Sequence, residues 1–166
     1  MPAMVDQLLF IKEFREQKAE TELQKSRVQL TEAHRVEDEA ARTRDEFVDF
    51  ARREELRWYD DLCSRLVTVR DITHVQEDVA TLRVTERDHE TAVERAAARR
   101  AEAQTQFSTA TQVRRDAQAA REKFVELATS FHALAAKEAE RREELELEEL
   151  AGQRREREEW GEAVDE

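Results

Sequence analysis

The feature that most constrains the fold of this chain is the absence of helix-breaking residues over most of its length. Its 166 residues include one proline, Pro2, two glycines, Gly152 and Gly161, and no asparagine. Turns between strands favour Gly, Pro, Asn and Asp, because these residues adopt turn conformations at low cost. The sequence therefore excludes a β-sheet protein and predicts an all-α fold with long helices.

One short stretch, residues 66–75, departs from this pattern because β-branched residues crowd it. Each of them loses side-chain freedom in a helix, at a cost of up to about 0.7 kcal/mol relative to Ala. Asp71 can act as a helix N-cap, and Thr73 followed three residues later by Gln76 is typical of a capping box. We therefore expect a turn near residues 69–74. The alternative is one helix that runs straight through, because packing can override propensity.

The expected architecture is an elongated two-helix antiparallel coiled-coil hairpin. We place its first helix over about 5–69 and its second over about 73–150, as a single domain of residues 1–150. Residues 151–166 are expected to form a flexible acidic tail. Trp160 in this tail is either incidental or an anchor for a partner.

A repeat with alternating spacings of four and three residues, typical of a coiled-coil seam, runs through the first expected helix. Its apolar members are Val5, Leu9, Ala19, Leu23, Leu30, Ala33, Ala40, Phe47, Ala51 and Trp58. Polar residues in the same register are Lys12, Glu16, Ser26, Glu37, Arg44 and Glu54.

The second expected helix has a similar seam that changes register halfway. The first part consists of Val75, Val79, Leu82, Val93, Ala96, Ala103, Phe107 and Ala110. The neighbouring register consists of Val113, Ala117, Ala120, Phe124, Leu127, Phe131 and Leu134. A turn centred near residue 72 would place Phe10 opposite Leu134 and Phe14 opposite Phe131. We therefore expect the open end of the hairpin to be its firmer part.

Charge and composition exclude several classes of function. A net charge of −12 argues against nucleic acid or an anionic membrane as the main partner, and no apolar run is long enough to cross a membrane. The single cysteine, Cys63, fits a reducing, cytoplasmic compartment. The four histidines lack metal-ligand spacing, and no glycine-rich loop can cradle a phosphate. We expect no metal, no cofactor and no enzymatic activity.

Three sequence patterns resemble the YscO family of type III secretion proteins, the injectisome relatives of the flagellar protein FliJ. The patterns are Leu8-x-x-Ile11-Lys12-x-x-Arg15-Glu16-x-x-Ala19-Glu20-x-x-Leu23, Glu54-Glu55-x-x-x-Tyr59-x-x-Leu62-x-x-Arg65, and Arg121-Glu-Lys-Phe-x-Glu126-Leu127 followed by Glu146-Leu-Glu-Glu149. They are helix-surface patterns and cover most of residues 8–150. The resemblance implies a two-helix stalk, similar to the γ subunit of rotary ATPases, in the pore of a hexameric secretion ATPase. It also implies links to the cytoplasmic domain of the export gate and to export chaperones.

Two candidate surfaces follow from this resemblance and from the residues. The charged end near the paired termini is expected to face the ATPase, because exposed ion pairs are weak and exchangeable. This set is Lys12, Arg15, Glu16, Glu20, Arg121, Glu122 and Lys123. The apolar tip is expected to meet the export gate or a chaperone, because it has more apolar surface than a hairpin end can bury. This set is Trp58, Tyr59, Leu62, Leu66, Val67, Val69 and Ile72.

The sequence is also compatible with two other interpretations. The main rival is a parallel dimeric coiled coil that acts as a scaffold or spacer, with polar seam residues setting its register. A second is a chaperone that cradles unfolded exports. A hairpin that satisfies its own seam should instead be a monomer.

Overall fold

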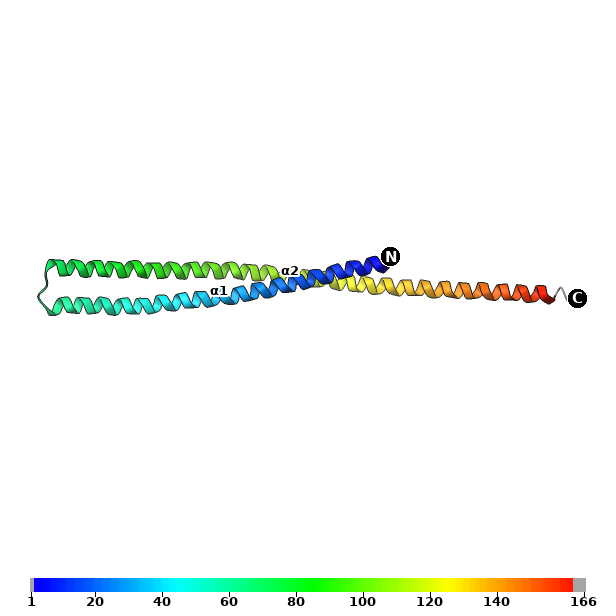
Figure 1. The fold of residues 1–166 in the computed structure, drawn as a ribbon, viewed down its shortest axis with the longest axis horizontal. Helices are drawn as coiled ribbons and strands as arrows, with labels where there is room; N and C mark the ends of the chain where they lie inside the picture. The colour runs from blue at the N-terminus through cyan, green and yellow to red at the C-terminus, as the bar shows by residue number, and fades with distance from the viewer. Residues whose placement is uncertain (1, 163–166) are drawn as a thin grey trace. The chain divides into compact units, whose positions relative to one another are not determined.

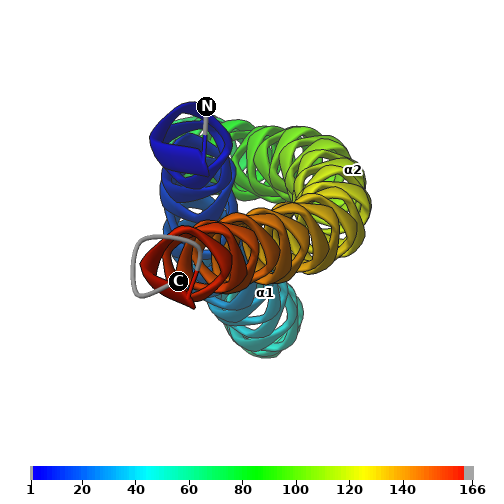
Figure 2. The same cartoon turned by 90° about the vertical axis from the view of Figure 1, so that its right-hand side faces the viewer.

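The computed structural model describes residues 2–162, which form two α-helices joined by a short connection (Figures 1 and 2). Helix α1 spans Pro2–Ser64 and helix α2 spans Val69–Glu162. Within residues 2–162 there is no β-strand. The predicted all-α hairpin is therefore confirmed, and a helix that runs straight through the middle of the chain is ruled out.

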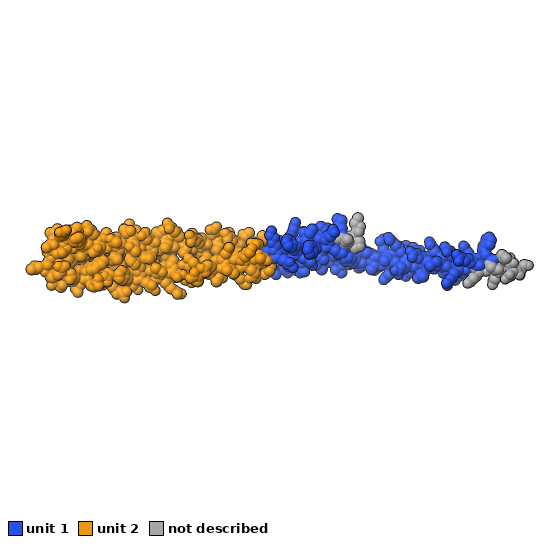
Figure 3. All heavy atoms as spheres, in the orientation of Figure 1, with its two compact units in different colours: residues 1–19, 114–166 blue, residues 20–113 orange. Residues whose placement is uncertain are grey.

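The chain divides into two compact units, each containing part of both helices (Figure 3). Unit 2, Glu20–Val113, contains the connection and the helical arms on either side of it. Unit 1 contains Met1–Ala19 and Arg114–Glu166. Two ion pairs cross from one helix to the other within each unit, so the two helical segments of each unit lie side by side and antiparallel. This pairing within one chain excludes the parallel dimer of straight helices.

The connection lies at residues 65–68, a few residues before the expected turn. Thr68 is the N-cap of α2, because its hydroxyl accepts a hydrogen bond from the Asp71 backbone N–H at 3.3 Å. The Asp71 carboxylate in turn accepts hydrogen bonds from the backbone N–H of Thr68 at 2.8 Å and from its hydroxyl at 2.9 Å. The expected box at Thr73 was wrong, since its hydroxyl donates to the Val69 carbonyl inside the helix.

The expected seam of the first helix is confirmed over its whole length. All sixteen of its positions, polar ones included, are buried or half-buried in the structure. Ala19 and Ala51 are 6% and 2% exposed. Ser26 is also buried, and its hydroxyl donates a hydrogen bond to the Leu23 carbonyl at 3.0 Å. Small residues at these positions allow the two helices to approach closely.

The seam of α2 agrees with the sequence up to Ala110 but then keeps its register instead of changing it. Val113, Leu127 and Leu134, which the expected change of register would bury, are 52%, 57% and 65% exposed. The buried or half-buried positions after Ala110 that continue the spacing are Arg114, Ala117, Arg121, Phe124, Ala128, Phe131 and Ala135. The expected switch was therefore wrong, because two arginines are accommodated in the seam.

The expected pairing of residues between the helices was also wrong, by one heptad. Glu37 forms its ion pair with Arg100, whereas the expected register places it beside Phe107. That register would also bring Arg100 to Arg44. A shift of seven residues keeps the same helix faces buried, but it leaves Glu37 without a cation and places two cations together. The charged seam residues therefore select the observed register.

As a result, the open end is not the firm apolar core that we expected. Phe10 and Phe14 are 68% and 59% exposed instead of packing on Leu134 and Phe131. Helix α2 continues to Glu162, past its expected end near residue 150. Residues 163–166 of the expected tail lie outside the described residues, and the flexibility of the tail stays a prediction.

Candidate functional site

The charged set expected to face the ATPase lies in unit 1, except for Glu20, which belongs to unit 2. Lys12, Glu16 and Arg121 are half-buried in the seam. The Lys12 ammonium lies 4.9 Å from the centroid of the Phe124 ring, within the range of a cation–π interaction. The Nε atom of Arg121 lies 2.7 Å from Oε2 of Glu16, but the angle does not make a hydrogen bond, so the contact is an ion pair. These three residues hold the helices together.

The remaining members of this set differ in exposure. Arg15, Glu122 and Lys123 are exposed, and Glu20 is half-buried. Arg15 is four residues from Ile11, so the two lie on the same face of α1. Exposed charges of both signs therefore occur close to exposed apolar residues that the charged set did not include.

The exposed large apolar residues of unit 1 that lie near the charged residues in sequence are here called the unit 1 apolar band. Its members on both helices are Met4, Leu8, Phe10, Ile11, Phe14, Leu127 and Leu134. Leu8 and Leu127 each directly precede a seam residue, which places them on the same flank of the antiparallel pair. The ion pair between Asp6 and His132, 2.9 Å apart, marks the other flank. The sequence indicates this apolar band, because the start of the first helix has more apolar residues than one coiled-coil seam can bury.

The expected apolar tip lies around the connection in unit 2, and most of its members are accessible. Leu66 and Val69 are 102% and 81% exposed. Tyr59 and Ile72 are 44% and 41% exposed. The members that are half-buried against the helix pair are Trp58, Leu62 and Val67. The sequence therefore identified an apolar surface around the connection.

Polar contacts order the surface around this tip. Arg83 on α2 reaches across to Glu55 on α1, with Nη2 and Oε2 2.6 Å apart, and also pairs with Glu86 at 2.9 Å. Hydrogen bonds with Glu86 and the charge of Glu55 raise the pKa of the Arg83 guanidinium. Hydrogen bonds from Thr68 hold the pKa of the Asp71 carboxyl below its ordinary value. The backbone next to the apolar tip is therefore fixed by a cap and a cross-helix ion pair.

The part of the chain that the structure describes offers little for other chemistry. Its His, Cys, Asp and Glu side chains form no cluster of three or more that could hold a metal ion. Neither helix, over its described residues, is long and apolar enough to span a membrane. Unit 1 and the tip have apolar and charged surfaces that are suited to contacts with other proteins.

Comparisons with known proteins agree with this description. A family model described as "Type III secretion protein YscO" matches residues 5–153. Among solved structures, the chain is similar to the crystal structure of the type III secretion protein YscO from Vibrio parahaemolyticus, with a TM-score of 0.83 and 24% sequence identity. The match covers 89% of this chain and 93% of that chain, and at this identity it supports the fold. A search of curated proteins gave no match.

Proposed function

Because this chain belongs to the YscO family of type III secretion proteins, we propose that it is a non-catalytic stalk of the export apparatus, acting on its cytoplasmic face. In this proposal, unit 1 sits in the pore of the hexameric secretion ATPase, and the tip contacts the export gate or an export chaperone. The supporting observation is that two antiparallel helices bury their own seam yet leave two separate apolar surfaces exposed.

The surface of unit 1 suits contact with a ring of six subunits. A single helix pair cannot match six subunits at once, so its contacts must be unequal and exchangeable as the ring changes state. Exposed charges such as Arg15 and Lys123 form ion pairs worth about 0–1 kcal/mol, and the unit 1 apolar band adds contacts without fixed direction. Lys12, Glu16 and Arg121 would act indirectly, by shaping this surface.

The test of the ATPase contact is a charge reversal at the exposed basic residues. We expect Arg15→Glu together with Lys123→Glu to weaken both co-purification with the cognate secretion ATPase and stimulation of its ATP hydrolysis. The matched control reverses Arg52 and Arg87, which are exposed arginines of unit 2. Unchanged binding and stimulation in the unit 1 variant would contradict the assignment.

The test of the tip is a pair of truncations that remove apolar side chains. Tyr59→Ala with Leu62→Ala should reduce secretion and binding to the cytoplasmic domain of the export gate or to export chaperones, while stimulation of the ATPase persists. Leu56→Ala is the control, because Leu56 is 64% exposed but is not a member of the tip. If the double variant secretes and binds both partners normally, these residues serve only in packing.

A further inference from the structure

The last part of α2 has no helix packed against it within the described residues. Ala135 is the last half-buried residue of the seam, and every side chain from Ala136 to Arg157 is exposed. This segment, here called the C-terminal extension, still carries large apolar residues. Leu145, Leu147 and Leu150 are 52%, 66% and 59% exposed.

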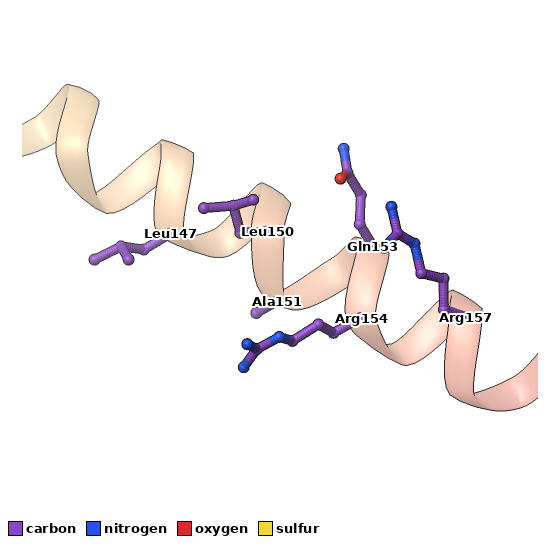
Figure 4. Close-up of a pocket in the computed structure, with 6 residues that line it drawn as sticks. All are labelled: Leu147, Leu150, Ala151, Gln153, Arg154 and Arg157. Atoms are coloured by element: carbon purple, nitrogen blue, oxygen red, sulfur yellow. The ribbon is translucent and has the colours of Figure 1, made fainter.

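A second seam with alternating spacings of three and four residues runs along this extension. Its members are Glu140, Glu143, Leu147, Leu150, Arg154 and Arg157. It lies on a different face from the hairpin seam, which would continue through Glu138, Arg142 and Leu145. Leu147, Leu150, Arg154 and Arg157 line one shallow concavity together with Ala151 and Gln153 (Figure 4). The extension therefore has an organised stripe that the hairpin does not use.

The second seam is complementary in charge to a second copy of itself that runs in the opposite direction. Two acidic residues are followed by two leucines and then by two arginines. When two copies of the stripe run antiparallel, Glu140 faces Arg157 of the other copy, and Leu147 faces Leu150. By the same symmetry, Glu143 faces Arg154. Both ends gain opposite charges and the centre becomes apolar, as a two-fold symmetric interface requires.

We propose that the C-terminal extension is a self-association surface, through which a second copy of this chain binds antiparallel. A parallel pair is disfavoured, because it would place glutamates against glutamates and arginines against arginines. The stripe is about five turns long, so its interface is smaller than that of most stable complexes. Pairing should therefore be reversible, dependent on protein concentration and weakened by salt. The proposal goes beyond the stalk function and does not rest on it.

The first test is analytical ultracentrifugation of the full chain over a wide concentration range. We expect the mass to rise from 19.5 kDa toward twice that value as concentration increases, and to fall again in high salt. Leu147→Glu with Leu150→Glu should weaken association at least tenfold. Leu145→Glu, a change of the same chemistry on the other face, should leave association intact. Circular dichroism verifies that both variants keep their helix content.

Charge exchange tests the pairing itself. Arg154→Glu with Arg157→Glu, and separately Glu140→Arg with Glu143→Arg, should each abolish association, because each stripe then carries one sign of charge at both ends. Mixing the two variants should restore it. A spin label at Ala139→Cys, in a chain with Cys63→Ser, should report a separation of about 28 Å between copies, at 1.5 Å per residue.

Three results would overturn the proposal. One is a wild-type chain that keeps the mass of a single copy at every concentration. Another is equal disruption by Leu145→Glu and by the double leucine variant, and the third is a label separation near 10 Å, which a parallel pair would give.

Discussion

Glu37 and Arg100 form an ion pair across the two helices of unit 2, with Oε2 and Nε 2.6 Å apart and both side chains largely covered. The pair occupies seam positions that most coiled coils fill with apolar residues. The pair specifies the register of the two helices, because a slip by one heptad would leave Glu37 facing Phe107 and bring Arg100 to Arg44. Unit 1 contains a pair of the same kind, Glu16 with Arg121.

We predict that Glu37→Gln lowers the free energy of unfolding by about 1 kcal/mol, because the change leaves a half-covered guanidinium without its counter-charge. Chemical denaturation followed by circular dichroism measures the loss. Exchanging the two residues, Glu37→Arg with Arg100→Glu, should recover most of it. Glu32→Gln is the control, since the Glu32–Arg35 pair is exposed on one helix and should contribute little. Equal effects of the two single variants would contradict a specific role for the seam pair.

The cap of α2 gives a second prediction. Thr68→Ala removes the hydroxyl that accepts the Asp71 N–H and should destabilise the protein by about 1 kcal/mol. Thr73→Ala should have a smaller effect, because the Thr73 hydroxyl only donates to the Val69 carbonyl within the helix. Thermal melts of the two variants compare them directly. A larger loss of stability for Thr73→Ala than for Thr68→Ala would indicate that α2 begins near Thr73.

The same cap should make the stability of the connection depend on pH. Hydrogen bonds from Thr68 lower the pKa of Asp71 in the folded chain, so its ionised form stabilises the fold at neutral pH. That contribution is lost as pH falls below about 4 and through the lowered pKa. The stability difference between wild type and Asp71→Asn should therefore shrink between pH 6 and pH 3. A constant difference across this range would show that ionisation of Asp71 is irrelevant.

The smallest seam residues give a prediction about packing. Ala51 is 2% exposed, so Ala51→Leu must push the helices of unit 2 apart. Overpacking of this kind should destabilise the protein by about 1–3 kcal/mol. Ala98→Leu, at an exposed position of the same unit, should be nearly neutral. Denaturation midpoints distinguish the two, and a stabilised Ala51→Leu variant would mean that the seam is loosely packed.

Much of the fold follows from the sequence because the seam is periodic. Every position that the spacing from Val5 to Trp58 predicted for the seam of α1, including the polar ones, is buried or half-buried. The connection was misplaced because a glutamine after Thr73 matched the usual capping box, whereas an aspartate after Thr68 serves equally well. Periodicity alone could not set the register, since a shift of one heptad buries the same faces. Matching glutamates to arginines across the seam would have set it.

The candidate site was less predictable. Charge alone could not show which residues of unit 1 are accessible, so Lys12, Glu16 and Arg121 were grouped with exposed residues although they lie in the seam. The tip was easier to identify, because apolar residues at a chain reversal have few neighbours to cover them. Leu66, at 102% exposure, is the extreme case.

The antiparallel hairpin in its observed register is the central claim, and distances between spin labels in unit 2 test it most directly. In a chain with Cys63→Ser, labels are placed at His34 with Gln104, and separately at His34 with Thr111. The observed register predicts a short His34–Gln104 distance and a longer His34–Thr111 distance, because seven residues at 1.5 Å each displace Thr111 by about 10 Å along the helix axis. Measured in dilute protein, the reverse order would mean a register slipped by one heptad. The absence of any short distance would contradict the hairpin.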